Sequence, residues 1–285
     1  MGSMMRFGPK SEGCFFHPPI QMKEHDPDEH QRRFYAFWCR IPSRPNFGDA
    51  LTPWLVQRIT GQYPVFVRPE DRRHKYFVTG SVLSYARTGC SVWGAGIMYR
   101  NDFVSPEANL LAVRGPLTRT RALECGADCP PVYGDPALLL PRFYRPGPKQ
   151  RHGLGIIVHF SDRLHMLASP QDSQEIRWID IQDPVESVID QIASCEFVAS
   201  SSLHGLIASH AYGIPAVWVK FRNLPSGDDS KFQDYFLSIG EEPPTPLWLR
   251  YDRIDCDVLA GLVRPVGMQL DLSPLWQACP FRSHT

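Results

Sequence analysis

The chain has 285 residues, of which 43% are hydrophobic, so it can bury a full core. Its length suggests about two domains. Thirty basic residues balance thirty acidic ones. This neutrality argues against a protein that binds nucleic acid or an acidic bilayer through its overall charge, and any positive charge used in function must be local.

The sequence predicts a cytoplasmic protein. No apolar run approaches the roughly 20 residues that span a bilayer, and the first residues lack the apolar stretch of a signal peptide. Association with the inner face of the plasma membrane would then be peripheral, through partners. The eight cysteines are scattered, several of them in apolar segments, and are expected to be free thiols. No histidine or carboxylate cluster has metal-ligand spacing, so we predict no metal.

Hydrophobic patterning divides the chain into five parts. Residues 1–33 are polar and aperiodic, which predicts a flexible lead-in. After them, short apolar runs alternate with small-residue turns and amphipathic segments, as is typical of parallel α/β sheets. We expect an α/β fold with two Rossmann-like doubly wound domains, over 34–143 and 153–250. A proline-rich linker is predicted at 144–152, and a C-terminal helix and tail at 251–285.

In the first predicted domain, strands are expected at 34–41, 75–80, 91–97, 109–115 and 131–135. A helix should follow the NFGD turn at 46–49 and stop at Gly61. Asp49 is interpreted either as the N-cap of this helix or as the group that accepts a sugar hydroxyl proton. A second helix should begin at Pro116.

In the second predicted domain, strands are expected at 155–160, 176–181, 196–200 and 216–219, and helices over 184–193 and 203–213. His210 falls at helical spacing with Leu203, Leu206 and Ile207, so we interpret it as a structural core histidine.

The sharpest functional signal is SSSLHG at 200–205, where a strand ends and a helix begins. In parallel sheets ligands bind at the carboxyl ends of strands. Exposed N–H groups and hydroxyls at a helix N-terminus suit a phosphate or carboxylate, so Ser200, Ser201, Ser202 and His204 are predicted to bind one. The alternative is that the serines only cap the helix and His204 is packed.

Arg114 provides a second signal, because it ends an apolar strand directly before a helix. Its guanidinium could grip an anion through two parallel bonds, and a structural ion pair is the alternative. Further candidates for binding the anionic groups of a donor are His159, Lys220 and Lys231. Those for an acceptor are Asn46, Asp49, Gly94 and Gly96.

Other chemistries lack their motifs. The sequence contains no GxxxxGK[ST] phosphate loop, no GxGxxG after a strand, no HExxH and no GxSxG.

Six stretches, in order, resemble the polysaccharide pyruvyltransferase family: NFGDALTPWLV, TGSVLSYA, VWGAGI, AVRGPLTR, VYGDPALLLP and SSSLHGLIASHAYGIPAVWV. They cover roughly residues 44 to 240 and look particularly like the ketal pyruvyltransferases of xanthan-type exopolysaccharide synthesis. The resemblance implies a GT-B-like pair of domains. It also implies phosphoenolpyruvate as co-substrate without a cofactor, a lipid-linked oligosaccharide or polysaccharide as acceptor, and a cyclic pyruvate ketal as product. It implicates His204 and Arg114 in donor binding.

Such a transfer needs an acid, a base and anion clamps. We expect Arg114 of the first domain and His204 of the second to clamp the donor between them, with its phosphate on the second-domain side. Asp49 is expected to act as base on the first-domain side, where the acceptor would bind. Two alternatives stay open from the sequence. One is a nucleotide-sugar GT-B glycosyltransferase, and the other is a non-catalytic saccharide-binding subunit of polysaccharide assembly.

Overall fold

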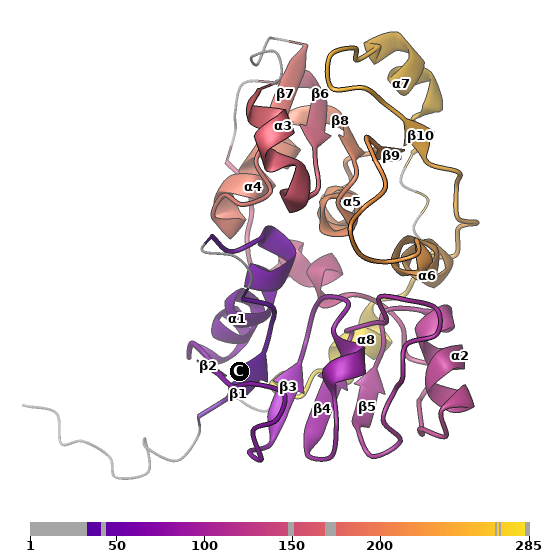
Figure 1. Ribbon diagram of the computed structural model, residues 1–285. Coiled ribbons are helices and arrows are strands. Elements are labelled where there is room, and N and C mark those ends of the chain that lie inside the picture. Colours follow the sequence, from indigo (N-terminus) through magenta and orange to yellow (C-terminus); the bar gives the residue numbers. More distant parts are fainter. Residues whose placement is uncertain are drawn as a thin grey trace, which may run out of the picture. The chain divides into compact units, whose positions relative to one another are not determined.

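Two parallel sheets organise the part of the chain that the computed structural model describes, residues 33–40, 44–147, 151–168, 175–265, 267 and 269–282 (Figure 1). The predicted lead-in lies outside the described residues up to residue 32. The α/β class is confirmed, and the two sheets are compatible with two Rossmann-like domains. The GT-B-like arrangement and the domain boundaries stay predictions.

The first sheet has the strand order β2-β1-β3-β4-β5, with all neighbours parallel. Its strands are β1 (Tyr35–Phe37), β2 (Val65–Phe66), β3 (Lys75–Phe77), β4 (Cys90–Trp93) and β5 (Asn109–Ala112). The strand predicted at 131–135 is wrong, because Tyr133 makes only an isolated bridge with Val113. The fifth strand is β2, whose two residues are too short for a periodicity signal.

Helix α1 (Phe47–Thr60) follows β1 and ends, as predicted, at Gly61, which adopts a φ of 75°. Its N-cap is Asn46, so the interpretation of Asp49 as N-cap is wrong: Asp49 lies in the first turn. Helix α2 (Pro116–Glu124) begins at Pro116 as predicted. Two 3-10 helices, Leu83–Tyr85 and Pro136–Arg142, complete this half.

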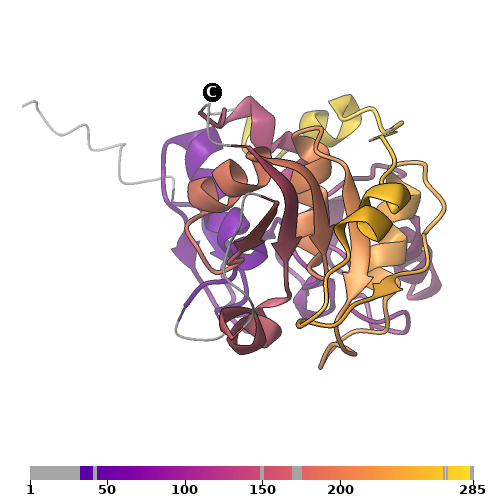
Figure 2. The same cartoon turned by 90° about the horizontal axis from the view of Figure 1, so that it is seen from above.

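The second sheet has the order β10-β9-β8-β6-β7, again all parallel (Figure 2). Its strands are β6 (His152–Ile157), β7 (Ile176–Ile179), β8 (Cys195–Ser200), β9 (Ala216–Lys220) and β10 (Leu247–Trp248). The helices are α3 (Arg163–Leu167), α4 (Val185–Ala193), α5 (Leu203–Ala211), α6 (Ser230–Ser238) and α7 (Cys256–Leu262). The four strands predicted here are confirmed, and β10 adds an unpredicted edge.

The C-terminal segment divides between the halves. Leu259 of α7 packs into the core of the second sheet. Helix α8 (Ser273–Gln277) instead lies among the elements of the first sheet (Figure 1). There Trp93 donates from Nε1 to the Leu275 carbonyl oxygen at 2.8 Å, and the rings of Phe281 and Phe34 meet edge to face. The largest hydrophobic cluster contains residues of both halves, so the two sheets share a core.

No helix in the described ranges is both long and apolar enough to cross a membrane.

Candidate active site

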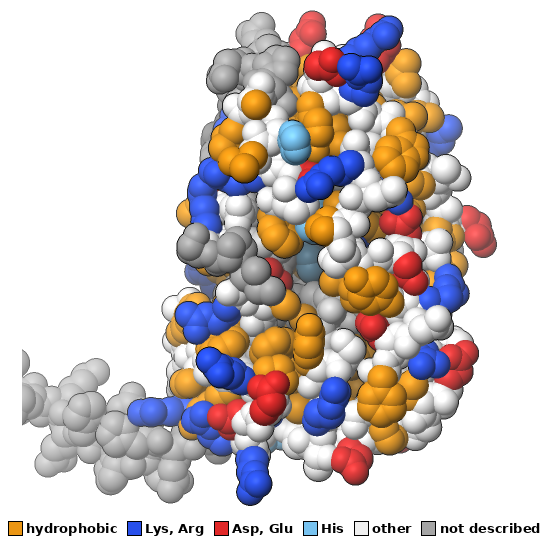
Figure 3. Space-filling view, viewed as in Figure 1, with side chains coloured by type: hydrophobic (Ala, Val, Ile, Leu, Met, Phe, Trp, Pro, Cys, Tyr) orange, Lys and Arg blue, Asp and Glu red, His pale blue; other side chains and the backbone are white. Residues whose placement is uncertain are grey.

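The site centres on His204, in the first turn of α5 directly after β8. Its side chain is 12% exposed, and its Nε2 lies 3.4 Å from Oδ2 of Asp135. The ring also packs on Gly48 of α1, where an added Cβ would lie 2.2 Å from Nδ1. The imidazole therefore reaches from the second sheet to two elements of the first. Figure 3 shows histidine atoms recessed in the middle of one face.

Asp49 lies in the same turn of α1 as Gly48. It accepts a hydrogen bond from Nδ2 of Asn46 at 3.2 Å. Burial raises the pKa of Asp49 to about 6, although the Asn46 hydrogen bond and the nearby charges of His204 and Lys231 act to lower it. A carboxyl group with this pKa is suited to proton transfer near neutral pH.

Lys231, at the start of α6, is the most unusual cation of the site. It is 6% exposed and makes no hydrogen bond or ion pair with any residue that the structure describes. Burial lowers its pKa to about 8, and Arg114 acts in the same direction, while Asp229 and Asp49 oppose the shift. Its ammonium lies 5.4 Å from the centroid of the Phe232 ring. Burying a cation without a counter-ion costs free energy, so a bound anion would be favoured here.

The three serines of the β8–α5 turn are buried, and the hydroxyl groups of two of them are bonded to backbone groups nearby. Ser200 Oγ donates to the carbonyl oxygen of Ser202 and accepts from its N–H, and Ser201 Oγ accepts from the N–H of His159. These bonds shape the turn. The first N–H groups of α5 have no helical partners, as at any helix N-terminus, and could bind an anion.

His159 is buried beside this turn, and its Nδ1 lies 2.9 Å from Ser161 Oγ. Burial lowers its pKa to about 4, and the charge of Lys231 adds to the effect. His159 is therefore neutral near pH 7 and could bind an anion only as an N–H donor. The donor-binding roles of His159 and of the serines stay predictions.

Arg114 is fully buried, which corrects the expectation of an open anion clamp. Its Nε donates to Asp234 Oδ2 at 3.0 Å, Nη1 to Ser81 Oγ at 2.8 Å, and Nη2 to the Ile97 carbonyl oxygen at 2.6 Å. The structural ion pair is thus the interpretation that the geometry supports. Because Asp234 lies on α6, the pair joins the end of β5 to the helix that carries Lys231.

Three other predicted binding residues have structural roles. Lys220 is ion-paired with Asp229, and its ammonium lies over two tryptophan rings. An added Cβ at Gly94 would lie 2.1 Å from Pro136, and one at Gly96 would lie 2.5 Å from Cζ of Arg114. Both glycines are buried and allow close packing, and their role in acceptor binding stays a prediction.

His210 is a buried structural residue, as predicted. Its Nδ1 lies 2.9 Å from the Tyr235 hydroxyl, and burial lowers its pKa to about 4.

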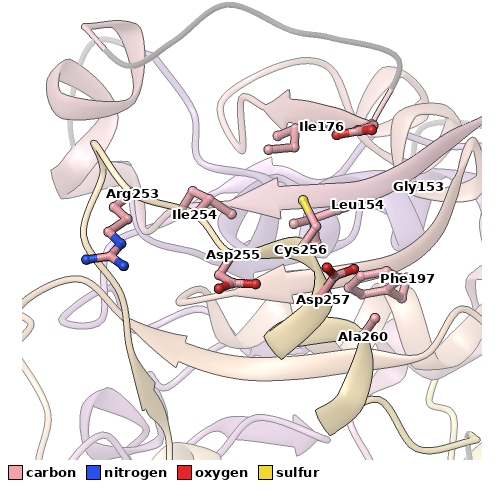
Figure 4. Close-up of a pocket in the computed structure, with 11 residues that line it drawn as sticks. Gly153, Leu154, Ile176, Phe197, Arg253, Ile254, Asp255, Cys256, Asp257 and Ala260 are labelled. Atoms are coloured by element: carbon pink, nitrogen blue, oxygen red, sulfur yellow. The ribbon is translucent and has the colours of Figure 1, made fainter.

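A cavity of about 660 Å³ lies away from this site (Figure 4). It opens at the amino ends of β6, β7 and β8, beside α7, with Leu154, Phe197 and Cys256 among its lining residues. Because parallel sheets bind ligands at the opposite ends of their strands, it is a poor candidate for the reaction. Within the described ranges, no three His, Cys, Asp or Glu side chains cluster as metal ligands.

Comparisons with known proteins point to one family of transferases. A family model described as polysaccharide pyruvyl transferase matches residues 15–221, a stretch that includes His204, Asp135 and Asp49 but ends before Lys231. An uncharacterized protein of Acanthamoeba polyphaga mimivirus is 31% identical over 75% of this chain and 77% of its own length. The succinoglycan biosynthesis protein ExoV of Rhizobium meliloti (strain 1021) is 27% identical over 68% of this chain and 62% of its own.

Proposed function

We propose that the donor of this enzyme is phosphoenolpyruvate. The chain belongs to the polysaccharide pyruvyl transferase family and is a pyruvyltransferase of polysaccharide synthesis. The proposed acceptor is a hexose of an exopolysaccharide repeat unit, carried on a lipid-linked oligosaccharide or polysaccharide. Two hydroxyls of this hexose take up the pyruvyl group as a cyclic ketal, and phosphate is released.

The observation that carries this proposal is the buried Lys231, whose ammonium makes no hydrogen bond or ion pair with a described residue and lies electrostatically close to Asp49. Asp49 in turn lies electrostatically close to His204, which is in the first turn of α5. Phosphoenolpyruvate carries a phosphate and a carboxylate, so its site needs concentrated positive potential even in a neutral protein. Lys231, His204 and the N–H groups of α5 could supply this potential. Arg114 would add to it without touching the donor.

The proposed reaction has two stages. Protonation of the donor methylene carbon gives a cationic centre at C2, which the first sugar hydroxyl attacks while Asp49 accepts its proton. The bond between C2 and the phosphate oxygen then breaks, with His204 giving a proton to the leaving phosphate. The second hydroxyl attacks the renewed cationic centre and loses its proton, which closes the ring. The products are one ketal and one phosphate for each donor.

Incubation of the protein with phosphoenolpyruvate and a defined glycan tests the proposal. The glycan should gain about 70 mass units, a pyruvate less one water, and one phosphate should appear per ketal. A thermal-shift comparison with UDP- and GDP-sugars covers the glycosyltransferase alternative, because only a bound ligand raises the melting temperature. Stabilisation by a nucleotide sugar, with no mass gain from phosphoenolpyruvate, would refute the proposed donor.

His204→Ala should abolish turnover and keep the fold. The matched control is His210→Ala, in the same helix but bonded to Tyr235. That variant should lower the melting temperature and, measured in the cold, keep turnover. Equal activity of the two variants would remove His204 from the mechanism.

A further inference from the structure

We propose that Asp135 is a positioning residue of the reaction, which holds the Nε2–H group of His204 and stabilises its imidazolium form. The inference rests on the proposed role of His204 at the donor. It gives a role to a carboxylate that also caps the 3-10 helix Pro136–Arg142.

The two oxygens of Asp135 have different surroundings. Oδ1 accepts the N–H of Ala137 at 2.9 Å and so caps the 3-10 helix Pro136–Arg142. Oδ2 is sealed from solvent and has no hydrogen-bond partner among the described residues. A cap needs one acceptor atom, which asparagine or serine would supply equally well. The second oxygen is therefore not explained by the cap.

The atom that faces this oxygen is equally unsatisfied. Nε2 of His204 lies 3.4 Å away, is itself sealed, and makes no hydrogen bond with a described residue. Leaving two buried polar atoms unpaired costs about 1–3 kcal/mol each. Tyr235 is also electrostatically close to Asp135, but its hydroxyl is bonded to His210. A small adjustment of the ring would turn the facing pair into a charge-assisted hydrogen bond.

A carboxylate at Nε2 has two chemical consequences. It fixes the proton of neutral His204 on Nε2, which leaves Nδ1, on the side of Gly48, as the nitrogen that takes up or gives up a proton. It can also stabilise the positive charge that the ring carries once Nδ1 has taken up a proton. His204 could then take up a proton at Nδ1 and give it to the leaving phosphate.

Asp135→Asn separates this role from the cap, because asparagine keeps an acceptor for Ala137 but presents an amide N–H group to Nε2. Nitrogen NMR of the ligand-free protein, with the ring assigned by comparison with His204→Gln, should show the proton moving from Nε2 to Nδ1. The melting temperature should stay close to that of the wild type. We expect kcat to fall by on the order of 100-fold or more, as when a catalytic histidine is held in the wrong tautomer.

Asp135→Ala removes both the cap and the charge, so it should lose as much activity as the asparagine variant and also melt earlier. The control is Asp255→Asn at the N-cap of α7, where the carboxylate accepts the Val258 N–H. It should change neither the tautomer nor kcat. Wild-type activity of Asp135→Asn, or an unchanged tautomer, would overturn the proposal. Because the NMR readout needs no donor, it remains decisive even if phosphoenolpyruvate proves not to be the substrate.

Discussion

The imidazole of His204 lies so close to Gly48 that a Cβ there would come within 2.2 Å of Nδ1. The contact joins the first turn of α5 to the first turn of α1. The three heavy atoms nearest to this hypothetical Cβ all belong to the His204 ring. A side chain at position 48 would therefore displace the ring, because a rotatable side chain moves more readily than the packed backbone.

Gly48→Ala should consequently lower kcat by roughly 10- to 1000-fold, since small misplacements of a reacting group have such effects. The fold should be kept. Kinetics and a melting curve measure the two effects separately. Gly261→Ala is the control, because a Cβ on that α7 residue meets no atom within 4 Å. Unchanged kcat in Gly48→Ala would show that the ring position is not critical.

The buried ammonium of Lys231 predicts a variant that gains stability and loses function. Its pKa falls from 10.5 to about 8, so the unfolded chain binds the proton more tightly than the folded one. The resulting loss of folding stability is fully present below about pH 8 and disappears above pH 10.5. Lys231→Met should therefore raise stability at pH 7 by on the order of 1–3 kcal/mol and raise the donor KM at least tenfold.

Lys75→Met is the matched control for Lys231→Met. Lys75 is as deeply buried, but its ammonium donates to the carbonyl oxygens of Pro69 and Asp71. Removing it leaves these acceptors unpaired, so this variant should melt earlier and keep the donor KM. A Lys231→Met protein that melts earlier than the wild type would contradict the idea of an unpaired cation.

The pH profile of donor kcat/KM should be bell-shaped. The rate should rise with pH through about 6, because Asp49 must lose its proton to act as base. It should fall through about 8 as Lys231 loses the charge that binds the donor. The donor phosphate also titrates near pH 6. Asp49→Asn therefore assigns the rising limb, and Lys231→Arg should move the falling limb to higher pH. A falling limb that stays in place in Lys231→Arg would exclude Lys231 as its source.

Local signals in the sequence predicted the local features of the fold. The stop at Gly61, the start at Pro116 and the strand that ends in SSSLHG all depend on a few adjacent residues, and all are confirmed. The two-residue strands β2 and β10 were missed, because they are too short to show alternation. The segment 131–135 looks like a strand, yet only Tyr133 pairs with a neighbour.

The site was harder to predict than the fold, because its properties depend on residues far apart in the chain. The sequence predicts a role for His204 from its position at a helix N-terminus, and this role stays a prediction. Its contact with Asp135 joins residues 69 positions apart, and no local pattern reveals it. The burial of Arg114 depends on an aspartate 120 positions away. Nothing in the sequence around Lys231 shows that its ammonium has no hydrogen bond or ion pair with a described residue.

The ion pair of Arg114 with Asp234 predicts that this arginine acts mainly through stability. Both side chains are fully buried, and Asp234 also accepts from the N–H and the hydroxyl of Thr118. Breaking a buried pair leaves an uncompensated charge and typically costs about 3–5 kcal/mol. Arg114→Met should therefore unfold at much lower denaturant concentration. Asp234→Asn, which keeps the shape of the acceptor, should cost less.

Arg114→Lys distinguishes the ion pair from an anion clamp. A lysine keeps the positive charge but cannot bond to Asp234, Ser81 and the Ile97 carbonyl at once. We expect lower stability from denaturant titration and, for the protein that remains folded, a donor KM within a few-fold of the wild type. A large rise in donor KM without loss of stability would restore direct contact between this guanidinium and the donor. Because Asp234 and Lys231 share α6, a shift of that helix would instead change stability and KM together in both Arg114→Lys and Asp234→Asn.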